Sequence, residues 1–247
     1  MNKPKIAIFD FTDCEGCEVQ IINLKEKLMN FLDYVDVINW RLGQTLNFKG
    51  PYDVALIEGT PIRPAEIEQL KSIRKKSKIL IALGACATLG GIPAIIEKEE
   101  RENLYKKIYG ADYKPVGIDA QPLSKYVEID YLLHGCPVSL SELERVLDDL
   151  LLGKKPKPPT TRVCFECKLN ENPCRLLEKK ICLGPITRSG CNAICVTSGS
   201  PCYGCLGPAS DAAVDNLKQI LTKFASDEEI EKSFEMFLNR KKEVWKI

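Results

Sequence analysis

The sequence predicts an α/β fold, a doubly wound parallel sheet followed by a small, irregular, cysteine-rich domain with terminal helices. Short aliphatic runs recur along residues 1–153, and stretches with helical apolar spacing separate them, which is typical of parallel strands joined by helices. Eight of the twelve cysteines lie between Cys164 and Cys205, in a stretch rich in glycine and proline that has no regular apolar period. Such a stretch buries too little side-chain surface to fold by itself, so we expect metal–thiolate bonds to fold it.

Five apolar runs are predicted to form the strands of the sheet. They are residues 6–11, 35–39, 53–58, 78–83 and 127–133. Helices are predicted at residues 18–32, 65–75 and 96–108. A further helix begins with a capping box formed by Ser139 and Glu142 and stops at Gly153. After the fourth strand, Gly90 and Gly91 are expected to keep the chain in a loop.

The run KKPKPPTT at residues 154–161 is predicted to be a stiff linker. It divides the chain into a sheet domain, residues 1–153, and a cysteine-rich, metal-binding domain, residues 154–247. Two terminal helices with apolar faces are expected at residues 208–224 and 227–242. These helices are predicted to pack back on the domain or on a partner.

Four cysteines each follow a predicted strand end. They are Cys14, Cys17, Cys86 and Cys136. Ligands of an open parallel sheet bind beyond the carboxyl ends of its strands, so these thiols are expected to meet at one edge and form a four-thiolate site. The alternative is that Cys86 and Cys136 are small core residues, because free cysteine is often buried.

Composition excludes several classes of function. Thirty-five Lys and Arg residues nearly balance 34 Asp and Glu, which gives no electrostatic argument for nucleic acid or a membrane surface. No apolar run is long enough to span a bilayer, so no direct membrane insertion is expected. No secretory signal precedes the first strand, and a reducing compartment keeps thiols free for metal.

The cysteine-rich segment alone leaves three kinds of cross-link open. Iron–sulfur clusters are one, and two zinc ions held by paired C-x2-C units are another. Disulfides are the third, and they would require an oxidising compartment. The density of cysteines argues against a set of unrelated free thiols.

The cysteines stand in a specific order of motifs. They are Cys14-Glu-Gly-Cys17, Gly84-Ala-Cys86, His134-Gly-Cys136-Pro137, Cys182-Leu-Gly-Pro185 leading to Cys191, and Pro201-Cys-Tyr-Gly-Cys205-Leu-Gly-Pro208. This order resembles the small subunit of [NiFe] hydrogenases along nearly the whole chain. It is similar in particular to the soluble cytoplasmic kind, such as the archaeal sulfhydrogenase, coenzyme F420-reducing and viologen-reducing enzymes.

The resemblance implies a flavodoxin-like first domain and three [4Fe–4S] clusters. The proximal cluster would be bound by Cys14, Cys17, Cys86 and Cys136. The distal cluster would be bound by Cys164, Cys167, Cys174 and Cys182. The medial cluster would be bound by Cys191, Cys195, Cys202 and Cys205. Twelve thiolates divide into three such sites with none left over.

Two positions depart from the membrane-linked members of that family. Cys164 stands where those members have a histidine ligand of the distal cluster, and Cys195 completes a medial site that commonly lacks one cysteine. Both departures favour low reduction potentials, because thiolates carry negative charge that disfavours an added electron. The sequence also shows no twin-arginine leader and no C-terminal anchor, so a cytoplasmic location is expected.

The resemblance implies an electron-transfer subunit with no catalytic residue of its own for H2. A partner large subunit would hold the nickel site, and a flavin- or iron–sulfur-containing subunit would accept the electrons. One alternative is a complex I-like iron–sulfur electron-transfer subunit, although that relative lacks the eight-cysteine segment. Another is a zinc-stabilised interaction module. A nucleotide-binding enzyme is not favoured, since the first turn has no glycine-rich phosphate motif.

Three further residues lie near the predicted proximal site. His134 is interpreted either as a packed imidazole or as a hydrogen-bond donor to the cluster. Glu18 and Glu58 are expected near the same crevice. Glu58 follows a strand as the site cysteines do, which is compatible with contact to the partner subunit, proton relay or an ordinary structural role.

Overall fold

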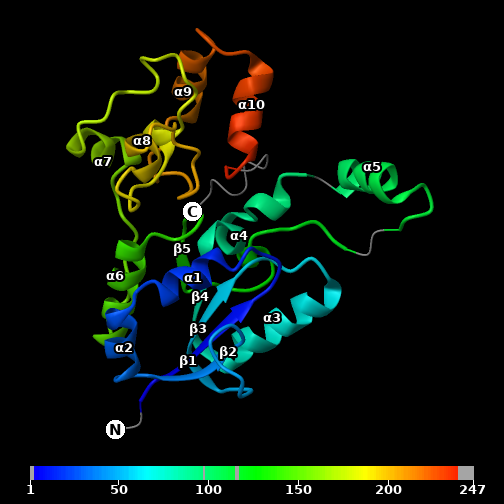
Figure 1. The fold of residues 1–247 in the computed structure, drawn as a ribbon, viewed down its shortest axis with the longest axis vertical. Helices are drawn as coiled ribbons and strands as arrows, with labels where there is room; N and C mark the ends of the chain where they lie inside the picture. The colour runs from blue at the N-terminus through cyan, green and yellow to red at the C-terminus, as the bar shows by residue number, and fades with distance from the viewer. Residues whose placement is uncertain (1–2, 97, 115–116, 239–247) are drawn as a thin grey trace.

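The computed structural model describes residues 3–96, 98–114 and 117–238, and its centre is a five-stranded parallel sheet (Figure 1). The strands are β1 (Lys5–Asp10), β2 (Asp36–Trp40), β3 (Tyr52–Glu58), β4 (Ser77–Leu83) and β5 (Tyr131–Leu133). Their order is β2-β1-β3-β4-β5, and every neighbouring pair is parallel. This is the flavodoxin-like doubly wound order, so the predicted fold class is confirmed.

Helices cover both faces of the sheet. On one face lie α1 (Gly16–Ile22), α2 (Glu26–Leu32) and α6 (Leu140–Leu151), and on the other lie α3 (Pro64–Lys76) and α4 (Gly84–Leu89). Strand β3 shows why both are needed: Leu56 packs with the first set of helices and Ile57 with the second. Side chains alternate along a strand, so a strand that is apolar at successive positions requires cover on both sides.

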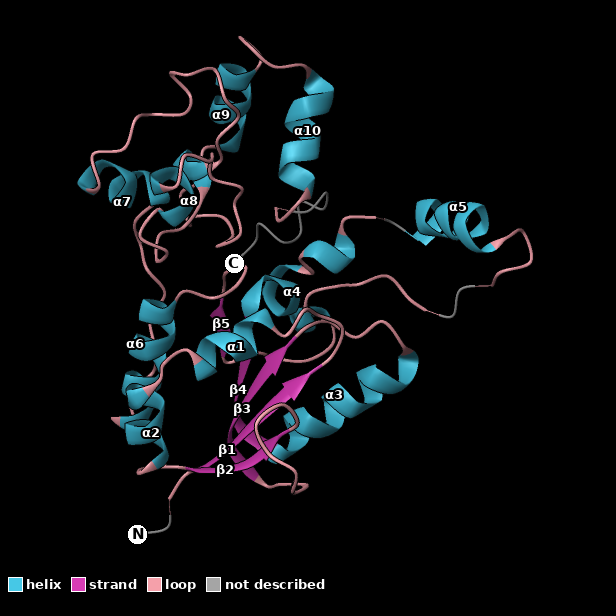
Figure 2. Cartoon of the chain, viewed as in Figure 1, coloured by secondary structure: helices cyan, strands magenta, loops and turns pink. Residues whose placement is uncertain are grey.

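The cysteine-rich region stands beyond the carboxyl ends of the strands and is mostly irregular (Figure 2). Its helices are α7 (Val163–Leu169), α8 (Ile194–Thr197), α9 (Val214–Leu221) and α10 (Asp227–Glu235). Helices α9 and α10 share a small core with Leu183 and Ile186. The remaining helix, α5 (Lys98–Tyr109), stands away from the sheet in both ribbon views.

Some predicted bounds were wrong. The helix expected at residues 18–32 is two helices, because the chain breaks at Lys25, whose φ is 53°. The last strand is only Tyr131–Leu133. The side chain of Asp130 accepts from the N–H of Leu80 (2.8 Å), so this carboxylate takes a position that backbone pairing would otherwise fill.

Two more predictions needed correction. No helix was predicted directly after β4, but α4 (Gly84–Leu89) forms there, before the loop expected at Gly90 and Gly91; Gly84 and the C-cap Gly90 both have positive φ. The helix expected from residue 208 begins at Val214, since Pro208 forms a β-bridge with Thr187. Two predicted helices extend beyond the described residues. They are the last one, at residues 239–242, and the helix predicted at 96–108, at residue 97.

Direct contacts join the cysteine-rich region to the sheet domain. The hydroxyl of Ser139, which caps α6, donates to the carbonyl of Gly190 over 2.6 Å. Phe237 packs against Ala85 and Leu89 of α4.

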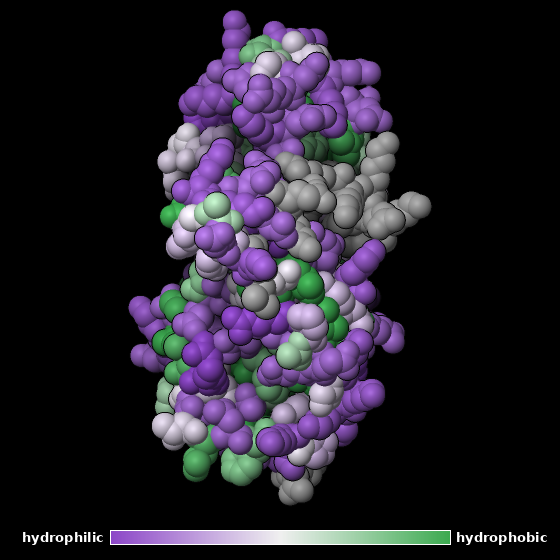
Figure 3. All heavy atoms as spheres, turned by 90° about the vertical axis from the view of Figure 1, so that its right-hand side faces the viewer, coloured by the Kyte–Doolittle hydropathy of each residue, from purple (hydrophilic) through white to green (hydrophobic). Residues whose placement is uncertain are grey.

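In the part of the chain that the structure describes, no helix has the length and apolarity needed to cross a membrane. Hydrophilic residues predominate on the face shown in Figure 3.

Candidate metal centres

The sheet edge brings together the four cysteines that follow strand ends. Cys14 lies in the loop after β1, Cys17 in α1, Cys86 in α4 and Cys136 after β5. Burial, and then the nearness of Cys136 and Cys14, raises the pKa of the Cys86 thiol to about 12. Burial is also the main cause that raises the pKa of Cys17, with contributions from Glu58 and Cys86. The four thiols therefore lie close enough to influence one another.

Glycines make room around these sulfurs. A Cβ atom added at Gly84 would lie 2.4 Å from the Cys17 Sγ, and the residue has a φ of +84°. Only glycine adopts that conformation without strain and leaves that space. A Cβ atom at Gly16 would lie 3.2 Å from the Cys14 Sγ. The backbone thus forms a close-fitting cradle on one side of the site.

A buried carboxylate fixes the start of α1. Glu58, at the end of β3, accepts hydrogen bonds from the backbone N–H of Cys17 (3.0 Å) and of Glu18 (2.8 Å). The Glu18 carboxylate accepts in turn from the indole Nε1 of Trp40 (2.8 Å). Sequence reasoning placed both glutamates near the crevice but missed Trp40, whose position at the end of β2 carries no motif.

Further acidic groups surround the site. Burial raises the pKa of Asp13 to about 7, against a hydrogen bond from the backbone of Glu15. Burial likewise raises the pKa of Glu18 to about 7, opposed by the hydrogen bond from Trp40. Within the described residues, one carboxylate oxygen of each, Asp13 Oδ2 and Glu18 Oε1, is buried and has no hydrogen-bond partner.

His134 is a packed imidazole rather than a donor to the sheet-edge site. Its Nδ1 lies 2.8 Å from the hydroxyl of Thr88, and that hydroxyl donates its one proton to the carbonyl of Gly84. Nδ1 thus has a buried partner in Thr88, while Nε2 is buried and has no hydrogen-bond partner within the described residues. Burial, and then Arg188, lowers the pKa of His134 to about 3, so the ring is neutral at pH 7.

A second group of four cysteines lies around α7. Cys164 and Cys167 lie on α7, Cys174 follows it, and Cys182 precedes a 3-10 turn at Gly184–Ile186. Burial, and then Cys182, Cys167 and Cys174, raises the pKa of Cys164 to about 11. The Sγ atoms of Cys164 and Cys182 both lie within 3.6 Å of the place that a Cβ at Gly184 would take. The structure thus brings these four residues together.

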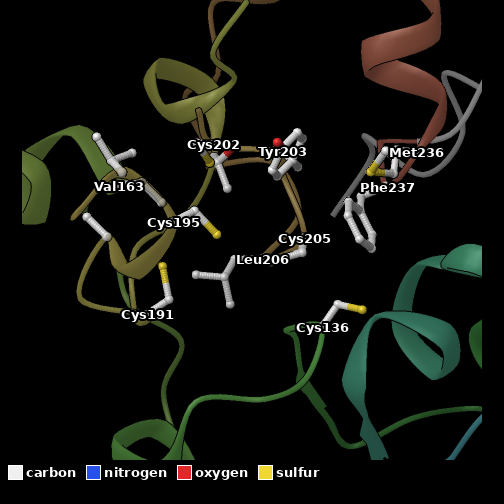
Figure 4. Close-up of a pocket in the computed structure, with 13 residues that line it drawn as sticks. Cys136, Val163, Cys191, Cys195, Cys202, Tyr203, Cys205, Leu206, Met236 and Phe237 are labelled. Carbon is white, nitrogen blue, oxygen red and sulfur yellow. The ribbon is translucent and has the colours of Figure 1, made fainter. Parts of the chain in front are cut away.

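The last four cysteines line one cavity of about 220 Å³ (Figure 4). They are Cys191, Cys195, Cys202 and Cys205. Apolar side chains, among them Leu206 and Phe237, form much of the remaining wall. Burial is the main cause that raises the pKa of Cys205, to about 12, and that of Cys191, to about 11. The volume is far more than a single ion or water fills.

The three groups lie in series. Cys136, from the sheet edge, also lines the cavity of the last group, with its sulfur turned away from Cys191 (Figure 4). On the other side, the backbone N–H of Cys202 donates to the Sγ of Cys182, 3.3 Å away. The cavity group therefore lies between the sheet-edge group and the group around α7.

The donor sets fit iron–sulfur clusters. A metal-bound thiol is deprotonated, so a cofactor that supplies positive charge would stabilise the thiolates in each group. Four thiolates are the ligand set of one [4Fe–4S] cluster. No three His, Cys, Asp or Glu side chains among the described residues are placed to hold one metal ion together.

Comparison with protein families gives a match at the sheet domain. The model of the family described as NADH ubiquinone oxidoreductase, 20 Kd subunit, matches residues 14–150. Curated relatives extend further. The chain is 37% identical over 235 residues to sulfhydrogenase 2 subunit delta of Pyrococcus furiosus, covering 94% of this chain and 98% of that one. It is 29% identical to one subunit of the F420-non-reducing hydrogenase vhu of Methanocaldococcus jannaschii, covering 85% and 84%.

Two solved hydrogenase structures also resemble this chain. A chain of an NAD+-reducing [NiFe]-hydrogenase in the H2-reduced state has a TM-score of 0.58 at 29% identity, covering 64% of this chain and 96% of that chain. An actinobacterial-type NiFe-hydrogenase from Ralstonia eutropha H16 has a TM-score of 0.60 over 94% of this chain and 85% of its own, and at 15% identity it supports the fold alone. The chain therefore belongs to the family of the NADH ubiquinone oxidoreductase 20 Kd subunit, together with the small subunits of [NiFe] hydrogenases.

Proposed function

We propose that this chain is the electron-transfer small subunit of a cytoplasmic [NiFe] hydrogenase. It would relay electrons between a nickel–iron site in a partner large subunit and an acceptor subunit. The observation that carries the proposal is the series of three four-cysteine groups, in which Cys136 lines the middle cavity and the backbone N–H of Cys202 donates a hydrogen bond to the Cys182 Sγ. A relay needs its redox groups to follow one another at short range.

The proposed cofactors are three [4Fe–4S] clusters, which supply one-electron transfer when they are bound. The proximal set is Cys14, Cys17, Cys86 and Cys136. The medial set is Cys191, Cys195, Cys202 and Cys205. The distal set is Cys164, Cys167, Cys174 and Cys182. We also propose the domain boundary at residues 153 and 154, with the proximal site in residues 1–153 and the other two in residues 154–247.

Exposure supports an entry and an exit at the two ends of the series. Cys14 and Cys136 are exposed at the sheet edge, and Cys164 is exposed at the other end. Cys182 and Cys202, where the distal and medial groups meet, are buried. We place the large subunit over the sheet edge and the flavin- or iron–sulfur-containing acceptor subunit near α7. The relatives' names as hydrogenase subunits support such an assembly.

The second candidate is a complex I-like electron-transfer subunit. The name of the matching family model favours it, but that model ends at residue 150, before the eight-cysteine segment. The relative from Pyrococcus furiosus, by contrast, is matched over 98% of its length. The hydrogenase assignment therefore accounts for more of the chain.

Metal analysis tests the proposal. Anaerobically purified protein should contain about twelve irons and matching sulfide, as three four-iron clusters require. It should be brown and should bleach on reduction. Stoichiometric zinc with no visible absorbance would instead indicate the zinc-stabilised module, and four irons would indicate a single cluster at the sheet edge.

A further inference from the structure

Glu166 connects the two cysteine groups of the C-terminal region. It lies on α7 between Cys164 and Cys167, but its carboxylate is directed at the loop around Cys191. Oε1 accepts from the N–H of Gly190 (2.8 Å), and Oε2 accepts from the N–H of Ala193 (3.3 Å). Oε2 also lies 3.9 Å from the Sγ of Cys191.

The loop that Glu166 binds has a strained backbone. Asn192 and Ala193 both have positive φ, 54° and 49°, and neither is glycine. Two successive left-handed residues cost energy, and an alanine gains no local side-chain hydrogen bond in return. One hydrogen bond of Glu166 is to Ala193 itself and the other is to Gly190, just before Cys191, so the carboxylate stabilises the turn that presents Cys191.

We propose that Glu166 is a positioning residue for Cys191 and that its negative charge lowers the reduction potential of the cluster that Cys191 binds. This inference rests on the proposed function, since it takes Cys191 to be a cluster ligand. Glu166 acts through Cys191, whose Sγ lies 3.9 Å from its carboxylate.

Two effects act in the same direction. The N–H of Gly190 donates to Glu166 and so is not available to the sulfurs of a cluster, whose potential depends on such hydrogen bonds, whereas the N–H of Ala193 is shared between Glu166 and the Cys191 Sγ. The carboxylate also disfavours an added electron by repulsion. With an effective dielectric constant of about 20, one charge ~12 Å away shifts a one-electron equilibrium about tenfold, and a nearer charge shifts it more. The contact with Cys191 Sγ is well inside that range.

The sheet-edge site repeats this arrangement. There Glu58 accepts from the N–H of Cys17 and from that of the next residue. In both sites a glutamate from a separate stretch of chain takes backbone donors next to a predicted ligand. The repetition supports a role in the clusters' surroundings over a chance contact on α7.

Two substitutions separate charge from geometry. Glu166→Gln keeps the size of the side chain and one acceptor but removes the charge, and Glu166→Asp keeps the charge but shortens the reach. Glu171→Gln is the matched control, because Glu171 is exposed and lies two residues beyond the end of α7. Each full-length, cluster-loaded protein is titrated with mediators, and the reduced fraction of each cluster is followed by electron paramagnetic resonance.

We expect Glu166→Gln to raise the ratio of reduced to oxidised medial cluster at least about tenfold at a fixed potential, and tenfold corresponds to about 59 mV for a one-electron couple. Glu166→Asp and Glu171→Gln should stay within about twofold of wild type, and the proximal cluster is the internal reference. An unchanged ratio in Glu166→Gln, or equal shifts in all three variants, overturns the proposal.

If Glu166→Gln does not retain the medial cluster, Glu166→Asp decides the question. A cluster kept at the wild-type potential supports the charge role, and a lost or shifted cluster overturns it. Failure of the proposed function itself has a different signature. Wild-type protein would then contain fewer than about twelve irons or would lack the third cluster signal.

Discussion

Replacing Glu58 by alanine should destabilise the sheet domain, since it removes the acceptor for two buried donors. The N–H groups of Cys17 and Glu18 would lose hydrogen bonds of 3.0 and 2.8 Å. A buried donor left unsatisfied costs about 1–3 kcal/mol, which gives about 2–6 kcal/mol for the pair. Burial raises the pKa of Glu58, so removing its carboxylate also removes a desolvation penalty. We therefore expect a loss of about 2–4 kcal/mol.

Urea denaturation of the anaerobic, cluster-loaded protein measures this loss. With an m value of about 2–3 kcal/mol/M, the Glu58→Ala midpoint should fall by about 1 M. Glu68→Ala is the control, because Glu68 is exposed on α3 and pairs with Lys71, an interaction worth about 0–1 kcal/mol. If the two variants have the same midpoint, the two hydrogen bonds of Glu58 do not stabilise the fold.

Three further substitutions test other parts of the molecule. Gly84→Ala should lose the proximal cluster, because the added Cβ would lie 2.4 Å from the Cys17 Sγ. The iron content should fall from about twelve to about eight per chain. The control Gly153→Ala, whose Cβ meets nothing within 4 Å, should keep its full iron content. Cys195→Ala should give a three-iron centre that is visible when oxidised and that couples magnetically to both neighbouring clusters; coupling to one neighbour alone would show that Cys195 belongs to the distal site. Burial alone would raise the pKa of Asp130. Hydrogen bonds from the Arg74 side chain and from the N–H of Leu80 outweigh it and hold that pKa below its usual range. The stability that the ionised Asp130 adds to the fold is therefore present above pH ~4 and is lost as the pH falls through its lowered pKa. The difference in unfolding free energy between wild type and Asp130→Asn should then shrink on acidification. A difference that grows would contradict this.

The sequence predicted the strands of the sheet well because strands covered on both faces are continuous apolar runs. Strand β3, with Leu56 and Ile57 buried on opposite sides, is the clearest example. The break at Lys25 was not predictable, since nothing in a run with helical spacing announces a single residue of positive φ. The late start of β5 depends on the side chain of Asp130 and a strand 50 residues earlier.

The candidate site was predictable only in part. The cysteines at strand ends could be grouped from topology, and the structure brings the thiols of that group together at the sheet edge. The ligand roles, and the pairing of the eight C-terminal cysteines, stay predictions. Glu166 gave no signal in the sequence because its carboxylate binds a loop more than twenty residues away, and such contacts leave no periodic pattern.

The hydroxyl of Ser139 accepts from the N–H of Glu142 at the start of α6 and donates to Gly190 of the cysteine-rich region. This one group therefore fixes the segment after Cys136 to the segment before Cys191. Electron tunnelling slows steeply as the gap between donor and acceptor widens. In a relay of the proposed kind, this hydrogen bond would restrict the relative motion of the two regions and so keep the distance between the first two clusters nearly constant. The rate of the first hop would then vary little from one turnover to the next.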